Sequence, residues 1–224
     1  LRVGLPVVDM VTGLNAAVGI LLALNERQTS GRGQFVEAAL YDCGVSLLHP
    51  HMPNFLATGK LPARTGNAHP NICPYDTFRT RTTPIFLAVG NDGQFARLCA
   101  ELGAPDLASR PEYADNRQRR AHSAALKAEL EALLADRDCE PLARSLIAKG
   151  VPCGPVCGLD EVVAHPHTAH RGMLVEIGDY RGTGSPIKLD RTPATYRLPP
   201  PAFGEHTEEE FARRGIAVPM RPIT

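Results

Sequence analysis

The hydrophobic pattern of the chain alternates between helical and strand-like segments. Apolar residues recur at spacings of three and four after Asp9, which predicts a helix that ends near Gly31 or Gly33. The same spacing and breaker residues predict further helices over 39–48, 93–102, 121–134, 140–149, 159–170 and 208–214. Short apolar runs predict strands over 3–9, 34–38, 85–89, 151–156 and 173–177. This alternation indicates an α/β or α+β protein.

Proline and glycine, 20 residues of each, mark the connections between these elements. They gather over 50–74, 150–158 and 182–201. We therefore expect residues 1–50 to belong to a large domain and 51–71 to form a linker. Residues 72–178, with strands and helices of their own, should form a small α/β domain, and 179–224 should be a linker followed by a return to the large domain.

Composition and charge narrow the class of protein. Of the 224 residues, 43% are hydrophobic and 21% charged, which is typical of a globular protein. Lys+Arg and Asp+Glu both total 24, so no basic excess indicates a nucleic-acid partner. No uninterrupted apolar run reaches the roughly 18 to 20 residues that span a membrane. Residues 1–6 show no signal-peptide pattern. Six scattered cysteines fit reduced thiols, so we expect a cytoplasmic protein without membrane contact.

Three groups of motifs follow one another along the chain. The first is VVDMVTG around Asp9, followed by an apolar helix and RQTSGRGQ over 27–34. The second is GNAHP over 66–70, with PY over 74–75 and VGNDGQF over 89–95. The third is GVPCGPV over 150–156, with RGM over 171–173 and GEHT over 204–207. In this order they resemble the class III CoA-transferases, a family of formyl-CoA and carnitine CoA-transferases with α-methylacyl-CoA racemase relatives.

The resemblance implies that Asp9 is the catalytic nucleophile. In such an enzyme CoA moves from an acyl-CoA donor to a free carboxylic acid through an aspartyl-CoA thioester. The CoA thioester is then a substrate, and no further cofactor is expected. The residues alone favour a different role, because Asp at a helix start is a good N-cap. The two roles are compatible, since the helix dipole also stabilises the carboxylate anion.

The GNAHP segment resembles the family's flexible loop over the active site, although it has fewer glycines. The resemblance makes Gly66, Asn67 and His69 candidate substrate-binding residues, with His69 as a donor to a substrate carboxylate. An ordinary linker turn and a structural histidine are the alternatives. After the strand over 85–89, Asn91 and Asp92 stand where racemase relatives use an acidic residue, and here Asp92 is expected to cap the following helix.

Two further clusters receive plainer interpretations. His165, His167 and His170 are close together, but no Cys or carboxylate pattern completes a metal site, so no metal is expected. Residues 117–120, with sequence RQRR, are expected to be a solvated face or the start of a helix, with contact to CoA phosphates as the less favoured alternative.

The resemblance also implies an architecture: part of a Rossmann-like large domain and a smaller α/β domain, in an interlocked homodimer whose linkers cross the partner. Family members begin with a Rossmann-type half that holds most CoA contacts, and the sequence lacks that half and an initiator Met. The chain is therefore expected to be a fragment, part of a longer polypeptide, or a degenerate gene. An acyl-CoA racemase and a non-catalytic fragment stay open as alternatives.

Overall fold

The computed structural model describes residues 4–216. Contacts divide the chain into two units, Leu1–Pro155 and Val156–Thr224, and each is described by itself. Helices and two small antiparallel sheets make this a mixed α/β protein, as the pattern predicted. The division falls inside the range 72–178, and the assignment of that range to one small domain stays a prediction.

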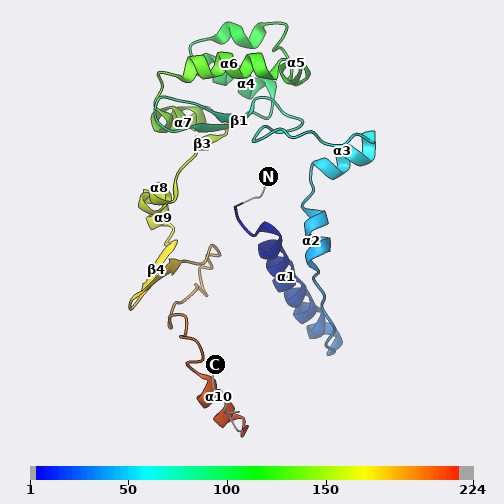
Figure 1. Ribbon diagram of the computed structural model, residues 1–224, viewed down its shortest axis with the longest axis vertical. Helices are drawn as coiled ribbons and strands as arrows, with labels where there is room; N and C mark the ends of the chain where they lie inside the picture. The colour runs from blue at the N-terminus through cyan, green and yellow to red at the C-terminus, as the bar shows by residue number, and fades with distance from the viewer. Residues whose placement is uncertain (1–3, 217–224) are drawn as a thin grey trace, which may run out of the picture. The chain divides into compact units, whose positions relative to one another are not determined.

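The first unit opens with three helices, α1 (Val7–Ser30), α2 (Leu40–Ser46) and α3 (His51–Thr58) (Figure 1). Helix α1 ends as predicted at Gly31, whose φ of 71° is the left-handed conformation that favours glycine. Helix α2 confirms the prediction over 39–48. Helix α3 lies in the expected linker, where a short helix rich in polar residues and proline gave no helical periodicity.

Two predicted strands near the N-terminus are wrong. Helix α1 already begins at Val7, because Pro6 with its φ of −76° leads directly into the helix; Val3, the first residue of that prediction, lies outside the described residues. Residues 34–38 have no strand partner in the described part of the chain. They lie against α1 instead: a Cβ on Gly19 would stand 2.8 Å from Val36 Cγ1.

Helix α1 also corrects the expectation about apolar runs. By length and composition this helix, Val7–Ser30, could cross a membrane, and none of its apolar stretch is buried. The interruptions by Gly13 and Asn15 are too few to offset its many Leu, Val, Ile and Ala residues. The core helix of a soluble protein can satisfy the same criterion, so this finding is a weak indication.

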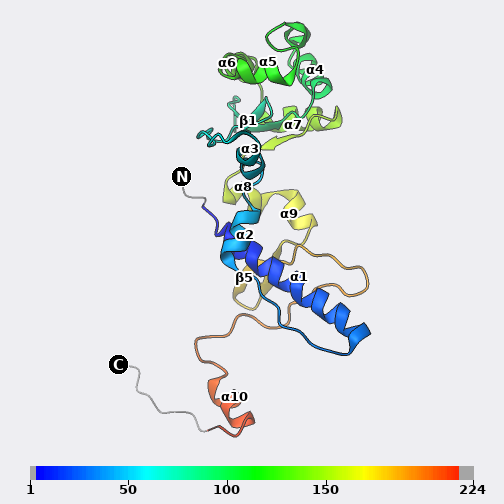
Figure 2. The same cartoon turned by 90° about the vertical axis from the view of Figure 1, so that its right-hand side faces the viewer.

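The rest of the first unit is compact. Strands β1 (Tyr75–Phe78), β2 (Ile85–Ala88) and β3 (Cys153–Pro155) form an antiparallel sheet in that order. Around it lie α4 (Asp92–Glu101), the 3₁₀ helix η1 (Pro105–Ser109), α5 (Asn116–Ala121), α6 (Ser123–Leu134) and α7 (Cys139–Ala148). Both views show α4, α5 and α6 on one side of this sheet (Figure 1, Figure 2). One hydrophobic core runs from Phe78 to Val151.

Most predictions in this part are confirmed, with small shifts at the ends. The strand over 85–89 and the helices over 93–102, 121–134 and 140–149 correspond to β2, α4, α6 and α7. The strand over 151–156 is shorter, as β3. Strand β1 was not predicted, because Asp76 and Thr77 interrupt its apolar pattern.

The second unit holds α8 (Leu159–Ala164), α9 (Pro166–His170), the hairpin β4 (Leu174–Ile177) and β5 (Tyr180–Thr183), and α10 (Thr207–Arg213). The helix predicted over 159–170 is split because His165 is extended before Pro166, a residue that disfavours helical backbone in its predecessor. Strand β4 and helix α10 confirm their predictions. Strand β5, the antiparallel partner of β4, was not predicted.

Candidate active site

Asp9 lies in the first turn of α1, two residues after the helix begins. Its predicted role as N-cap is wrong, because Pro6 occupies that position and has no side-chain cap bond. The Asp9 side chain is exposed and makes no hydrogen bond or ion pair within residues 4–216. A carboxylate in the first turn gains about 0.3–1 kcal/mol from the helix dipole. The structure therefore offers an anionic, unengaged carboxylate at the positive end of a long helix.

Helix α2 packs beside this turn through small and polar residues. A Cβ on Gly44 would stand 3.7 Å from Val8 Cγ1, so the two helices approach closely. About two turns further along α1, Asn15 Nδ2 donates to Cys43 Sγ at 3.4 Å. These contacts fix the first half of α1 against α2.

A loop before β1 brings together the three predicted substrate-binding residues. Gly66 has a φ of 66°, which an L side chain rarely adopts, and a turn closes there with Ala68 N donating to Thr65 O at 3.2 Å. Asn67 Nδ2 donates to Thr77 Oγ1 at 3.2 Å. His69 N donates to Tyr75 O at 2.9 Å. The loop thus folds back onto β1, and the described contacts do not join it to Asp9.

The His69 imidazole is held in one orientation, and its surroundings favour the neutral ring. Its Nδ1 accepts from Asn71 N at 3.1 Å, and its ring stacks on Tyr75 with centroids 4.9 Å apart. Burial, followed by the charges of His51, His49 and Arg120, lowers the pKa of His69 below 6.5. With Nδ1 an acceptor, the neutral ring carries its proton on Nε2, which can donate to a ligand.

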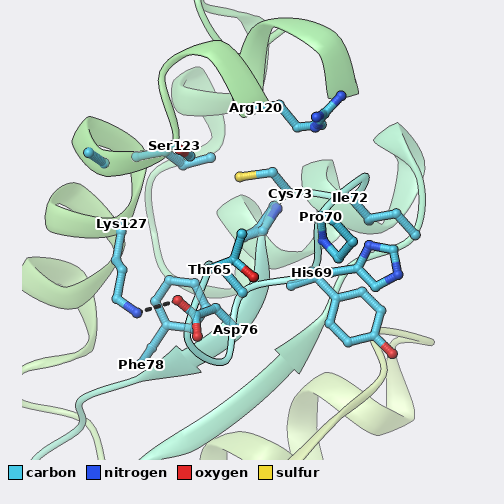
Figure 3. A pocket seen from close by; sticks show the side chains of 15 residues that line it. Thr65, His69, Pro70, Ile72, Cys73, Asp76, Phe78, Arg120, Ser123 and Lys127 are labelled. Carbon is cyan, nitrogen blue, oxygen red and sulfur yellow. Dashed lines mark hydrogen bonds and ion pairs between the residues drawn. The ribbon is translucent and has the colours of Figure 1, made fainter. Parts of the chain in front are cut away.

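A pocket of about 340 Å³ opens beside His69 (Figure 3). Loop 65–74, strand β1 and helices α5 and α6 supply its walls. Apolar side chains form much of its lining, among them Ile72, Phe78 and Leu126. The charged groups at the pocket are Asp76, Arg120 and Lys127.

Two of these charges neutralise each other. Lys127 Nζ donates to the Asp76 carboxylate and, at 2.8 Å, to Thr77 O, and it lies 5.1 Å from the Phe78 ring centroid. Asp76 Oδ1 also accepts from Thr77 N at 2.7 Å. Both groups are occupied by these contacts, so the charge that remains at the pocket is that of Arg120.

Helix α5 fixes the wall that follows His69. Asn116 Oδ1 accepts from Cys73 N at 3.0 Å, and Asn116 Nδ2 donates to Asn71 O at 2.9 Å. One turn further on, Arg119 Nε donates to Cys73 O at 2.8 Å. The side chains of two helical residues therefore hold the backbone of residues 71–73.

Arg119 is itself almost fully buried, with 1% of its surface exposed. Besides Cys73 O, it donates to Tyr113 O at 3.0 Å and to Asp92 Oδ1 at 2.6 Å, and its guanidinium lies 4.6 Å from the Phe95 ring centroid. The predicted solvated face is thus wrong for this residue. The N-x-x-R spacing, which places both side chains on one face of a helix, was the available signal.

Other predicted groups have structural roles. The cap of α4 is Asn91, whose Oδ1 accepts from Gln94 N at 2.9 Å, while Asp92 pairs with Arg119. Burial raises the pKa of the Cys73 thiol, with Arg119 acting in the opposite direction, so this pocket residue is a neutral thiol rather than a nucleophilic thiolate. His165 Nδ1 caps α9 by accepting from His167 N at 3.1 Å. Across the described residues, no three His, Cys, Asp or Glu side chains are arranged to hold a metal.

Comparison with known proteins places these elements in one family. The family model for CoA-transferase family III matches residues 1–207. The chain is 36% identical over 221 residues to succinate–glutarate CoA-transferase of Agrobacterium fabrum, and this match covers 95% of this chain and 54% of that protein. It is 35% identical over 181 residues to acetyl-CoA:oxalate CoA-transferase of Acetobacter aceti, covering 81% and 46%.

A solved structure agrees with this assignment. The crystal structure of a CAIB/BAIF family protein from Brucella suis superposes with a TM-score of 0.76 at 36% identity, over 95% of this chain and 56% of that one. The chain therefore belongs to CoA-transferase family III, and it spans about half the length of the curated relatives that it matches.

Proposed function

We propose that the protein to which this chain belongs transfers CoA from an acyl-CoA to a dicarboxylic acid, with Asp9 as the nucleophile. The observation that carries the proposal is the exposed, unengaged Asp9 carboxylate in the first turn of α1, within a chain that belongs to CoA-transferase family III. The two curated relatives are named for succinate, glutarate and oxalate, all of them dicarboxylic acids. This favours a transferase over a racemase.

The chemistry begins when an Asp9 carboxylate oxygen attacks the thioester carbon of the acyl-CoA. The C–S bond breaks, CoA leaves as a thiolate, and an acyl-aspartyl anhydride remains. The thiolate then attacks the aspartyl carbonyl, which releases the donor acid as a carboxylate and leaves an aspartyl-CoA thioester. The acceptor carboxylate enters and the steps run in reverse, so that Asp9 is regenerated. No net proton or electron is consumed.

The loop with Gly66, Asn67 and His69 is the proposed contact for the reacting carboxylate. The neutral His69 ring can donate from Nε2 while Nδ1 stays bound to Asn71 N. The positive φ of Gly66 and the bond from Asn67 to Thr77 shape the turn that presents this donor. A fixed donor needs little reorganisation during the reaction.

The same proposal includes the assembly. The complete protein would hold a Rossmann-like large domain that supplies CoA contacts, and it would be a cytoplasmic, interlocked homodimer with no cofactor besides its CoA substrate. The apolar, uncovered surface of α1 supports it, because such a helix in a soluble protein is covered by other parts. Light scattering of the complete gene product should give the mass of a dimer, and a stable monomer at micromolar concentration would contradict the assembly.

The nucleophile is tested by substituting Asp9→Asn in the complete gene product. An amide is no nucleophile, so transfer should fall by at least about a thousandfold, because most of the rate depends on holding a carboxylate oxygen against the thioester carbon. In the wild type, mass spectrometry should find CoA attached to the peptide that contains Asp9 after incubation with an acyl-CoA.

The matched control is Asp42→Asn, the same change in the first turn of the neighbouring helix α2. It alters the dipole interaction to a similar extent but should leave transfer unchanged. If Asp9→Asn keeps full activity, or if no CoA adduct forms in an active wild type, Asp9 is not the nucleophile.

A further inference from the structure

The pocket beside His69 has one charged group that the protein itself leaves unpaired. Arg120 lines the pocket from the end of α5, is exposed, and makes no hydrogen bond or ion pair within the described residues. Asp76 and Lys127, the other charges there, are bound to each other. The pocket therefore carries one uncompensated positive charge, which favours a ligand with one negative charge at that end.

Arg119, the residue before Arg120, has the opposite environment because it points to another face of α5. Arg119 is 1% exposed and its guanidinium is taken up by Cys73 O, Tyr113 O and Asp92. Arg120, the next residue, points to a different face of α5 and reaches none of them. These two arginines of α5 therefore have different roles. Arg119 stabilises the wall of the pocket, whereas Arg120 is available to bind a ligand.

The polar groups at the pocket stand on opposite sides of an apolar lining. Figure 3 shows Arg120 and Ser123 on one side and His69 on another, with Cys73 between them. The Ser123 hydroxyl has no partner among the residues that the structure describes, so it can donate. Ala68, Pro70 and Ile72, which are partly exposed at the pocket, supply apolar surface for a short hydrocarbon chain. A volume of about 340 Å³ is enough for a small diacid or its acyl group.

The wall of the pocket is held firmly enough to favour ligands of a particular length. Asn116 and Arg119 hold the backbone of residues 71–73 by three hydrogen bonds of 2.8–3.0 Å. His69 is fixed through Asn71 N and Tyr75. The fold thus holds the His69 ring and the part of α5 that carries Arg120, and this framework limits the length of a ligand that reaches both.

We infer that this pocket binds the remote carboxylate of a dicarboxylic substrate, with Arg120 as its cation and Ser123 as a donor, while the reacting carboxylate lies at His69. The inference rests on the proposed function and adds the residues that distinguish a diacid from a monoacid. Arg120 acts as a specificity-determining residue and takes no part in bond making.

The test compares glutarate with valerate as acceptors in the complete gene product. Both have five carbons, and valerate lacks one carboxylate. Arg120→Gln should raise the KM for glutarate by roughly tenfold to a hundredfold, the usual effect of losing a charge-assisted hydrogen bond, and should leave the KM for valerate unchanged. Arg120→Lys should restore part of the loss. Arg117→Gln, on the same helix but outside the pocket, should change neither value.

Two results would overturn the inference while leaving the transferase intact: an unchanged glutarate KM in Arg120→Gln, or an equal rise for both acids, which indicates a structural effect. If the wild type transfers CoA to neither acid, the proposed function fails instead. NMR titration of the 224-residue chain with glutarate then decides the binding alone. Amide shifts near residues 120–124 that disappear in Arg120→Gln support the site, and shifts that persist in that variant, or that never form, refute it.

Discussion

The two parts of the first unit cover their apolar side chains to very different extents. Between β1 and β3, Leu98, Leu130 and Leu146 are fully buried in one core. In α1, Leu14, Leu21 and Leu22 are each 64–65% exposed, and no residue of that helix is buried. Both parts are rich in leucine, so composition alone does not explain the difference.

The difference lies in periodicity and in partners. Helices α4 and α7 are amphipathic and turn one apolar face to the sheet. Helix α1 carries apolar residues on all sides, and within the described residues its main helical neighbour is α2. A helix that is apolar all round is buried on all sides or lies in a membrane. Residues 75–155 therefore carry their own core, whereas among the described residues no comparable core covers α1.

The largest effect expected from this comparison comes from a leucine exchange. Leu130→Ala should lower the free energy of unfolding of the chain by about 2–5 kcal/mol, because it removes a fully buried side chain and leaves a cavity. Leu21→Ala should change it by less than about 0.5 kcal/mol. Urea denaturation followed by circular dichroism measures both. Equal losses would show that α1 has a core of its own.

A smaller loss is expected at the buried arginine. Arg119→Met keeps most of the apolar stem but leaves Cys73 O and Tyr113 O without their donor, which should cost about 1–3 kcal/mol. Hydrogen exchange should also become faster at Cys73. Arg117→Met, on the exposed side of α5, is the control and should be nearly neutral. No difference between the two variants would contradict the role given to Arg119.

The acid dependence of stability should be smaller still. The hydrogen bonds from Lys149 and Ser145 lower the pKa of Glu101 below 4.5. A carboxyl group whose folded pKa is depressed stabilises the fold above its unfolded pKa, and this contribution is lost as the pH falls through the folded pKa. Because Lys149 is half exposed, the contribution should be about 0.5–1 kcal/mol.

Urea midpoints measured between pH 6 and pH 3 check this expectation. Glu101→Gln should reduce the midpoint at pH 6 and flatten its fall towards pH 3. Glu37→Gln, an exposed position in the segment after α1, should reproduce the wild-type curve. A Glu101→Gln curve that keeps the wild-type slope would refute the assignment.

The smallest expected effect is on the pKa of one side chain, His69. His69 should titrate below 6.5 in NMR spectra, since burial and neighbouring positive charges disfavour its cation. Arg120 is one of those charges, so Arg120→Gln should raise the pKa of His69 slightly while keeping it below 6.5. A value at or above 6.5 in the wild type would contradict the half-buried, neutral ring.

Local patterns predicted the self-contained part of the fold well and the rest less well. Helices α4 and α7 were found because a clear apolar face coincides with turn residues at both ends. Strands β1 and β5 were missed because Asp76 and Arg181 interrupt them, and each becomes a strand only through its neighbour. The segment 34–38 alternates like a strand but has α1, rather than a sheet, beside it.

The candidate site shows the same division. Asp9, Gly66, Asn67 and His69 could be named from motifs, and the structure places the last three in one loop. Arg119 and Asn116 were not recognised, because their partners at residues 71–73 lie more than 40 positions earlier in the chain. The N-x-x-R spacing shows that the two side chains share a helix face, but it does not show that Arg119 is buried, since that burial depends on carbonyl groups that the tertiary fold supplies.

The hydrogen bonds from α5 to the backbone of residues 71–73 determine when the His69 loop can fold during synthesis. Arg119 is made 46 residues after Cys73, whose carbonyl it holds. At about 5–20 residues per second, the ribosome needs roughly 2–9 seconds to cover that distance. Until then the His69 loop lacks the contacts that shape it, although the β1–β2 hairpin beside it can already pair. Slow codons between positions 73 and 119 would lengthen the time during which this loop is exposed to proteases and chaperones.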